Sequence, residues 1–285
     1  MAISATGLGS GLDIEGLVTQ LISAERAPLE QRIFRDERKL TSDISALGSL
    51  KSALSDLDAS VQAVSDSATY TKKNVSTSDA TKLTATATDA ASVGSYDVEV
   101  TNLAATQSLA VRAEFSAVTE AVGTGTLTFT FGTTGYTADS SNNNNDTYDS
   151  FVAKAGAASN TVTIDATNNT LAGVRDAIND ADIGVTAAIV NQGNNYRLLI
   201  SSEASGAENS LQISVSDSGD SNDTDANGLS RLAFNASAGT GNVYQTVAAA
   251  DAAFKINGLT LSSATNTVST AIDGLTFNLL EATSG

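Results

Sequence analysis

The chain has no cysteine, no histidine and no tryptophan, and its 285 residues include a single proline, Pro28. Without cysteine it forms neither a disulfide framework nor a thiol nucleophile, so cysteine usage leaves its redox compartment open. Without histidine, catalysis would need paired carboxylates, a lysine, a tyrosine or a bound metal. Aromatic residues make up only 5% of the chain, so we expect hydrophobic cores built mainly from valine, leucine, isoleucine and alanine.

Positive charge is also scarce. The chain has 15 Lys and Arg against 32 Asp and Glu, a formal net charge of −17. Residues 1–66 carry 6 basic and 10 acidic residues, a net charge of −4, and residues 67–285 carry 9 and 22, a net charge of −13. Nucleic acids and anionic membranes attract clustered Lys and Arg, so we predict that neither is a partner. The charge is interpreted as a means of keeping the protein soluble.

Long apolar runs and catalytic fingerprints are missing as well. No apolar run approaches the roughly 18 residues of a membrane-spanning helix, and the N-terminus lacks the basic and apolar regions of a secretory signal. We therefore expect a chain that is cytoplasmic or exported by a route that reads no cleaved signal. No nucleophile elbow or P-loop is present, and the stretch "GLGSGL" follows no strand. Neither an enzyme nor a bound cofactor is expected.

One acidic stretch, "DSGDSNDTDANG" at residues 217–228, has part of a calcium-binding pattern. From Asp223 to Gly228 it matches the opening of a helix–loop–helix calcium loop. The twelfth position is Phe234, where a bidentate glutamate is needed, and no helix is predicted before the loop. We interpret the stretch as a solvated turn and assign no metal ligands, with a bound cation as the alternative.

The first 66 residues predict a helical stem. Asp13 is placed as an N-cap, and apolar residues recur from Ile14 to Ile22 with helical spacing. Pro28 predicts an end or a kink at Ala27, and it also suits the first turn of a second helix.

The second predicted helix carries a seven-residue apolar repeat. Five a positions are apolar, the last three d positions are apolar, Asp36 and Asp43 take the earlier d positions, and Ile44 lies beside the repeat. A sustained seven-residue repeat specifies the seam of a coiled coil or helical bundle. We predict that the following seam residues pack against partner helices: Ile33, Leu40, Leu47, Leu50, Leu54, Leu57, Val61 and Val64.

The alternative for this seam is packing against its own domain. A helix of ~35 residues is ~50 Å long, more than a small β domain covers. Partner helices from the same chain or from other subunits are therefore favoured. No such helix is predicted in the remaining residues of the sequence.

After residue 67 the pattern changes to the period of two that is typical of strands. We predict strands at 72–76, 83–88 and 94–103, and then an alternating strand with Leu127, Phe129 and Phe131 on one face. The stretch "DSSNNNNDTYDS", 139–150, is interpreted as a polar surface loop or insertion.

One short helix interrupts the strands. Thr170 caps it, and Leu171, Val174 and Ile178 line one face. A hairpin of strands at 185–191 and 196–201 and a strand at 210–217 follow, and the C-terminal stretch predicts three more strands. The fold class is therefore α+β and mainly β: a long N-terminal helical coiled-coil stem followed by a β-rich body.

Three stretches carry a resemblance to a known family. The stretch "ATGLGSGLDIEGLVTQLISAERAPLEQ" resembles the N-terminus of the flagellar filament cap proteins, the hook-associated protein 2 family. Residues 170–202 are similar to the internal repeat shared by flagellins and hook-associated proteins. Residues 251–283 resemble the start of the C-terminal region of the cap family, and the three stretches stand in the family's order.

The resemblance implies a non-enzymatic function. Cap proteins form a homo-oligomer at the distal end of the extracellular flagellum and promote the folding and polymerisation of flagellin into the filament. They leave the cell unfolded, by the flagellar type III route and without a cleaved signal. The implied partners are copies of the chain itself, flagellin and the hook–filament junction proteins. The glycine–serine residues before Asp13 are then a flexible export and assembly segment.

The resemblance also implies a domain division. Residues 1–67 form the flexible head and half of the stem, 68–114 plus 242–285 form an inner β-rich head domain, and 115–241 form an outer β-rich head domain inserted in it. The family pairs its N-terminal stem helix with a long C-terminal helical segment, whereas this sequence stops at Gly285. We interpret the sequence as a fragment or a partial portion, and the number of subunits stays open.

Two other functions are considered. An adhesin would bind host glycans or surfaces through the outer head domain, and the polar loop at 136–150 motivates this alternative. A hook-junction protein or a flagellin is the third possibility, and the "GLGSGLDI" stretch and the order of the three stretches oppose it.

Overall fold

The computed structural model describes residues 13–66, 70–138, 146–236 and 242–283. The chain divides into two compact units, Met1–Thr71 and Lys72–Gly285.

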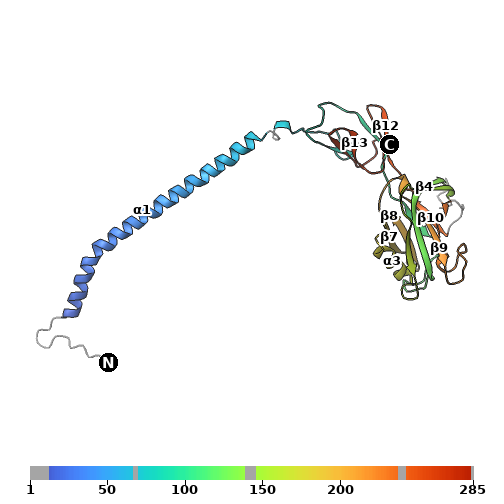
Figure 1. Ribbon diagram of the computed structural model, residues 1–285, viewed down its shortest axis with the longest axis horizontal. Helices are drawn as coiled ribbons and strands as arrows, with labels where there is room; N and C mark the ends of the chain where they lie inside the picture. The colour runs from blue at the N-terminus through green and yellow to red at the C-terminus, as the bar shows by residue number, and fades with distance from the viewer. Residues whose placement is uncertain (1–12, 67–69, 139–145, 237–241, 284–285) are drawn as a thin grey trace, which may run out of the picture. The chain divides into compact units, whose positions relative to one another are not determined.

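The longest described element of the first unit is the helix α1 (Ile14–Ser65), of 52 residues. Asp13 is its N-cap, because its side chain accepts a hydrogen bond from the Gly16 amide at 2.9 Å. Of the predicted end or kink at Ala27, the end and the separate second helix are wrong, since Pro28 lies inside α1. Proline in a helix interior removes a backbone donor and bends the helix, and Figure 1 shows α1 bent in its blue N-terminal part. At 1.5 Å per residue α1 is about 78 Å long.

The second unit is rich in β-strands. Its described strands are β1 (Leu83–Ala87), β2 (Val98–Asn102), β3 (Ser108–Val111), β4 (Gly125–Thr137), β5 (Thr147–Ala153), β6 (Asn160–Ile164), β7 (Val185–Asn191), β8 (Tyr196–Ser202), β9 (Ser210–Asp217), β10 (Val243–Val247), β11 (Ala252–Ile256), β12 (Leu259–Ser263), β13 (Thr267–Ile272) and β14 (Leu275–Leu279). Its described helices are α3 (Leu171–Asp180) and two 3-10 turns, η1 (Ala207–Asn209) and η2 (Gly228–Leu232). The predicted fold class, mainly β with a long N-terminal helix, is confirmed, and the coiled-coil packing of that helix stays a prediction.

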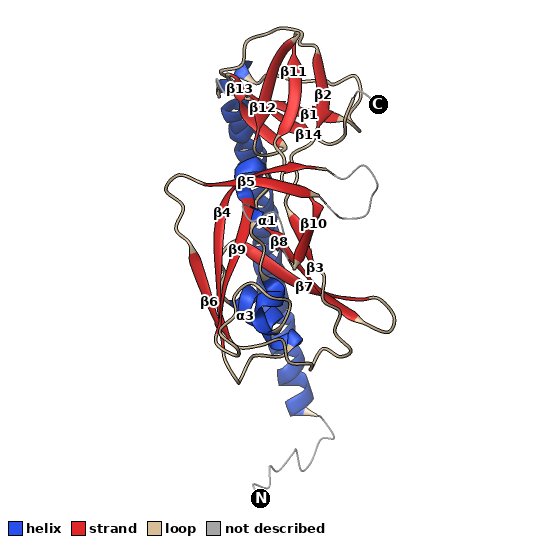
Figure 2. Cartoon of the chain, turned by 90° about the vertical axis from the view of Figure 1, so that its right-hand side faces the viewer, coloured by secondary structure: helices blue, strands red, loops and turns tan. Residues whose placement is uncertain are grey.

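Two antiparallel three-stranded sheets, β1-β14-β13 and β12-β11-β2, form the small β-core. Strands that are far apart in sequence pair here, as Leu83 opposite Leu279 and Val100 opposite Phe254 show. Figure 2 shows these six strands grouped together. Their inward-facing side chains, Val100, Phe254 and Phe277 among them, form one hydrophobic cluster.

The large β-core contains the sheet β10-β3-β8-β7 and a second sheet in which β4 pairs with β5, β6 and β9. Alternation along β4 buries Leu127 and Phe129 completely, and Phe131 packs against the same cluster as a partly buried residue. The prediction for this strand is confirmed. Phe115 and Phe234 are also fully buried in this core.

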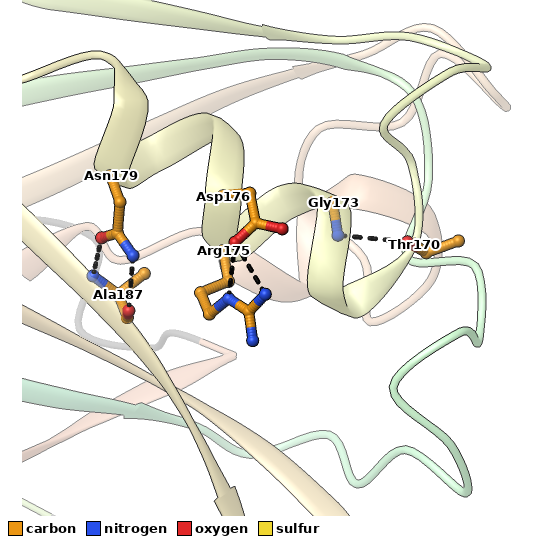
Figure 3. A network of polar contacts seen from close by, with 6 residues as sticks. All are labelled: Thr170, Gly173, Arg175, Asp176, Asn179 and Ala187. Atoms are coloured by element: carbon orange, nitrogen blue, oxygen red, sulfur yellow. Dashed lines mark hydrogen bonds and ion pairs between the residues drawn. The ribbon is translucent and has the colours of Figure 1, made fainter.

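Helix α3 packs on β7 and β6. Thr170 caps it through a 3.1 Å hydrogen bond from the Gly173 amide, and Leu171, Val174 and Ile178 are its buried residues. Figure 3 shows how Asn179 fastens α3 to the next strand. Its amide group accepts a hydrogen bond from the Ala187 amide at 2.7 Å and donates one to the Ala187 carbonyl at 3.0 Å. The predicted cap and apolar face are confirmed.

The chain passes between the small β-core and the large β-core at two places. The small β-core includes Ala104 and Ala252, whereas the large β-core includes Leu109 and Val243. The changeover therefore lies between 104 and 109 on the way out and between 243 and 252 on the way back. The domain boundaries after residues 114 and 241 stay a prediction.

Several strand predictions are wrong in detail. Residues 72–76 form no strand, residues 147–150 of the predicted loop belong to β5, and the C-terminal stretch has four strands in place of three. Val152 and Tyr148 give the polar-looking stretch at 147–153 enough β-forming character to pair with β4. Residues 139–145, the centre of the predicted polar loop, lie outside the described residues.

Candidate assembly interface

Helix α1 has no buried residue along its whole length. All eight predicted seam residues are exposed, with exposed fractions from 55% at Val61 to 65% at Leu40. The structure therefore places the seam on a single solvent-facing helix and brings no described side chain onto it. No helix in the described part of the chain combines the length and the apolar composition needed to cross a membrane. An exposed apolar stripe of this size marks an interaction surface, and its seven-residue repeat is typical of a helix that packs against other helices.

The seven-residue spacing of the seam predicts the geometry of its partner. In an ideal straight α-helix, a position drifts by about 20° per heptad, so the a positions from Ile33 to Val61 drift by about 80° over four heptads. Partner helices stay in contact with such a stripe when the helices wrap around each other in a left-handed supercoil.

Sequence reasoning missed apolar residues that extend the stripe towards the N-terminus. Leu29 lies four residues before Ile33 and therefore takes the d position of the preceding heptad, and Ile22 lies seven residues before Leu29. Both are exposed, at 61% and 48%. Their seven-residue spacing was the available signal, and Pro28 obscured it because it suggested a break between the two.

The two halves of the seam differ in polarity. Residues 26–43 have Asp36 and Asp43 at d positions, whereas residues 44–64 have leucine or valine at both a and d. Within the described residues, none of the three ion pairs lies in α1. Two of its arginines, Arg35 and Arg38, donate to backbone carbonyls one turn earlier. The hydrophobic contact is therefore expected to centre on residues 44–64.

Burial of the seam would release a large free energy. Full burial of a leucine, isoleucine or valine side chain contributes about 1.5–3 kcal/mol. Even if only half of the eight side chains were fully covered, the gain would reach about 6–12 kcal/mol, the size of the stability of a typical domain. A partner helix thus has enough hydrophobic surface here to drive a stable assembly.

Carboxylates of the acidic loop at 217–228 accept hydrogen bonds from backbone amides of the loop and of η2. Asp217 is buried, and its carboxylate accepts hydrogen bonds from the amides of Gly219 at 2.7 Å and Leu229 at 2.6 Å. Asp223 in turn accepts from the Asp217 amide at 2.6 Å. Among the described residues no group of three or more acidic side chains is arranged to hold a metal ion. The loop is a hydrogen-bonded turn built around Asp217.

Two family models match the chain. The model described as the flagellar hook-associated protein 2 N-terminus matches residues 10–107, and the model described as the flagellar hook-associated protein 2 C-terminus matches residues 249–285. The first match includes α1, β1 and β2, and the second covers β11–β14, so the two models together cover α1 and every strand of the small β-core.

Known proteins of the same family resemble the chain over nearly its whole length. The A-type flagellar hook-associated protein 2 of Pseudomonas aeruginosa is 37% identical over 297 residues, which is 99% of this chain and 56% of that protein. The flagellar hook-associated protein 2 of Escherichia coli K12 is 33% identical over 94% of this chain and 51% of its own length. The chain therefore spans about half the length of the curated relatives it matches.

Solved structures of flagellar cap proteins also resemble the chain. The D1-D2-D3 domains of the flagellar cap protein FliD from Escherichia coli superpose with a TM-score of 0.66 at 31% identity, over 85% of this chain and 60% of that one. The D2-D3 domains of the same protein superpose with a TM-score of 0.58 at 30% identity, over 74% of this chain and 91% of that one. The chain belongs to the flagellar hook-associated protein 2 family, whose solved members are flagellar cap proteins.

Proposed function

We propose that the full-length protein forms a homo-oligomeric cap at the distal tip of the bacterial flagellum and promotes the folding and polymerisation of flagellin. The observation that carries this proposal is the exposed seam of α1 in a chain of this family. A helix of 52 residues that buries none of them is suited to assembly with other helices. The relatives named above are flagellar hook-associated and cap proteins, which supports the location at the tip.

In this proposal α1 is the assembly element. The seam pairs with the C-terminal helical segment of the stem or with α1 of neighbouring subunits, and burial of its leucines holds the oligomer together. The small β-core corresponds to the inner head domain and the large β-core to most of the outer head domain. Both have buried hydrophobic clusters of their own, so they can form a stable plate above the stem.

The proposed mechanism is mechanical and requires no bond-making by this chain. Subunits rotate or step as each flagellin arrives beneath the plate, and flagellin folds in the sheltered space. Copies of the chain, flagellin and the hook–filament junction proteins are the partners in this scheme. Export by the flagellar type III route precedes assembly, since the cap functions outside the cell.

The test uses cells that lack their own cap protein and carry the full-length gene that contains this segment. The quantity measured is flagellin retained in filaments against flagellin shed into the medium. We expect the wild-type gene to restore filaments and the double variant Leu47→Asp, Leu54→Asp to shed nearly all flagellin, because two charges in the seam prevent helix packing.

A matched control places the same charges on the opposite side of α1. Ser45 and Ser52 lie two residues before Leu47 and Leu54, about 160° away around the helix at 100° per residue. The Ser45→Asp, Ser52→Asp variant is expected to restore filaments. If the seam variant also restores them, the seam is not the assembly interface. If the wild-type protein is exported and folded but flagellin is still shed, the cap function is wrong and binding of an external surface becomes the better account.

A further inference from the structure

Strand β7 lies at the edge of the sheet β10-β3-β8-β7, and β8 is its only strand partner among the described residues. It pairs with β8 over all seven residues, from Val185 opposite Ser202 to Asn191 opposite Tyr196, without a register shift. Its sequence, "VTAAIVN", contains no charged residue and no proline. An open edge of this length and composition is a place where a strand of another molecule can be added.

Backbone hydrogen bonds fix which residues of β7 face β8. The Gly184 carbonyl accepts a hydrogen bond from the Glu203 amide at 3.0 Å. The Gln192 amide donates one to the Asn195 carbonyl at 2.8 Å. In an antiparallel ladder the backbone groups of successive residues point alternately towards the partner strand and away from it, so the even-numbered residues face β8. The odd-numbered residues present their amides and carbonyls to the open edge: Val185, Ala187, Ile189 and Asn191.

Asn179, near the end of α3, occupies part of this edge, as Figure 3 shows. Its side chain accepts a hydrogen bond from the Ala187 amide at 2.7 Å and donates one to the Ala187 carbonyl at 3.0 Å. An asparagine side chain has one carbonyl and one NH₂ group, so it offers the two kinds of group that a neighbouring strand would offer. Both outward backbone groups of Ala187 are therefore taken.

Two other edge strands of the large β-core have a different kind of protection. Both β10 and β5 pair with their neighbours through a register shift, and such irregularities distort an edge and hinder the addition of a strand. Strand β7 has no shift, and no hydrogen bond joins the outward groups of Ile189 to another described residue. The contact from Asn179 is therefore what interrupts an otherwise regular edge.

We propose that Asn179 prevents a second copy of the chain from adding its own β7 to this edge. Two identical strands can meet antiparallel about a twofold axis, where each offers the other the same outward groups. Seven residues span about 24 Å, and an uncharged strand brings no like charges opposite each other. Loss of the Asn179 side chain would free both groups of Ala187 and leave the edge open from Val185 to Asn191.

Asn266 supplies a matched control, because it makes the same pair of bonds at a residue that belongs to none of the described strands. Its side chain accepts from the Ala104 amide at 2.7 Å and donates to the Ala104 carbonyl at 3.0 Å. Asn179→Ala and Asn266→Ala should both lower the melting temperature, since each leaves two backbone groups without their partner. In sedimentation velocity, only Asn179→Ala should self-associate more than the wild type, at concentrations at least about tenfold lower.

A second substitution tests whether β7 is the contact between the copies. Ala188 is an exposed residue of β7, and a lysine on an edge strand opposes pairing with another strand. Ala188→Lys added to Asn179→Ala should return self-association to the wild-type level while the melting temperature stays low. Thr260→Lys adds the same charge at an exposed position of β12 and should leave the association unchanged. Reversal by both lysines or by neither would overturn the proposal.

Hydrogen exchange of the β7 amides locates the contact. In dilute Asn179→Ala, the Ala187 amide should exchange at least about tenfold faster than in the wild type, because its hydrogen bond is lost. In concentrated Asn179→Ala, the amides of Ala187 and Ile189 should both exchange at least about tenfold more slowly than in the dilute sample, because strand pairing protects them. If the variant associates no more than the wild type, or associates without this protection, Asn179 only fastens α3 to β7 and the proposal is wrong.

Discussion

Helix α1 and the unit Lys72–Gly285 are built from the same aliphatic residues but use them in opposite ways. Every buried hydrophobic residue among the described residues lies in the second unit, and α1 has none. The β-cores close on themselves because period-two alternation puts apolar side chains on facing sheets. The seven-residue repeat of α1 instead directs its leucines towards a partner helix. The buried clusters lie within the β-rich unit, whereas α1 keeps its apolar side chains exposed for the assembly proposed above.

The largest contrast is expected between core and seam truncations. Phe254→Ala in the small β-core should lower the free energy of unfolding by about 3–5 kcal/mol, because it leaves a cavity at a side chain that is only 1% exposed. Leu54→Ala in α1 should change it by less than about 0.5 kcal/mol in this chain, since Leu54 is 63% exposed. Urea unfolding followed by tyrosine fluorescence measures both. Similar losses for the two variants would show that α1 already packs within the chain.

A second prediction concerns the close contact between the two β-cores. Gly206 has a φ of +103°, and a Cβ atom there would lie 2.7 Å from the Ala264 Cβ. Gly193 has a similar φ of +99°, but open space around it. Both Gly→Ala variants strain the backbone by about 1–2 kcal/mol, and only Gly206→Ala adds a clash. Thermal unfolding should therefore show a larger decrease in melting temperature for Gly206→Ala than for Gly193→Ala. Equal decreases would mean that the loop at Gly206 can move away from Ala264.

Helix caps sharpen the comparison at a smaller scale. Thr170 caps α3 and Asp13 caps α1 through the same kind of side-chain to amide bond. Thr170→Ala should lower the free energy of unfolding of the β-rich unit by about 1 kcal/mol. Asp13→Ala should leave that unfolding unchanged and reduce only the helical signal in circular dichroism. A change in the unfolding of the β-rich unit caused by Asp13→Ala would contradict the independence of the two regions.

The smallest predicted effect depends on pH. Hydrogen bonds from the amide and the hydroxyl of Ser116 lower the pKa of Glu120 from its ordinary value of 4.5. Because the folded state favours the ionised carboxylate, this stabilisation is present above pH 4.5, the ordinary pKa of the group. It is lost as the pH falls through the lowered pKa of the folded state. Glu120 is partly exposed to solvent, which screens the interaction, so the contribution is expected to stay below about 1 kcal/mol. Ser116→Ala should shift the carboxyl titration of Glu120, followed by NMR, upward, and no shift would contradict this assignment.

Much of the second unit could be predicted from its sequence because local signals agree there with long-range packing. Strands β7 and β9 have the predicted bounds and β8 differs by one residue, as the alternation between turn residues indicated. The cap and the apolar face of α3 follow from Thr170 and the spacing of Leu171, Val174 and Ile178. The local sequence pattern did not show which strands pair with each other. For example, β1 pairs with β14, almost 200 residues away.

The wrong predictions have identifiable physical reasons. Of the two outcomes predicted for Pro28, an end or a kink, the helix shows the kink, and only the separate second helix is wrong, because residues with good helix propensity surround Pro28. Residues 72–76 have strand-forming character but no strand partner within the described chain, so composition alone did not make them a strand. The seam was visible in the sequence because its repeat is long and regular, whereas the pairing of β1 with β14 joins segments that meet only in three dimensions.

The most direct test of the central claim compares the two sides of α1 in the assembled protein. Single cysteines are introduced as Leu54→Cys in the seam and Ser52→Cys on the opposite side, in a chain that has no other cysteine. The rate of maleimide labelling is measured in this chain and in the assembled full-length protein. We predict similar rates for both cysteines in this chain, where both positions are exposed, and in the assembly a rate at Leu54→Cys at least about tenfold below that at Ser52→Cys. Equal rates in the assembled protein would contradict the account, because they would show that no partner covers the seam.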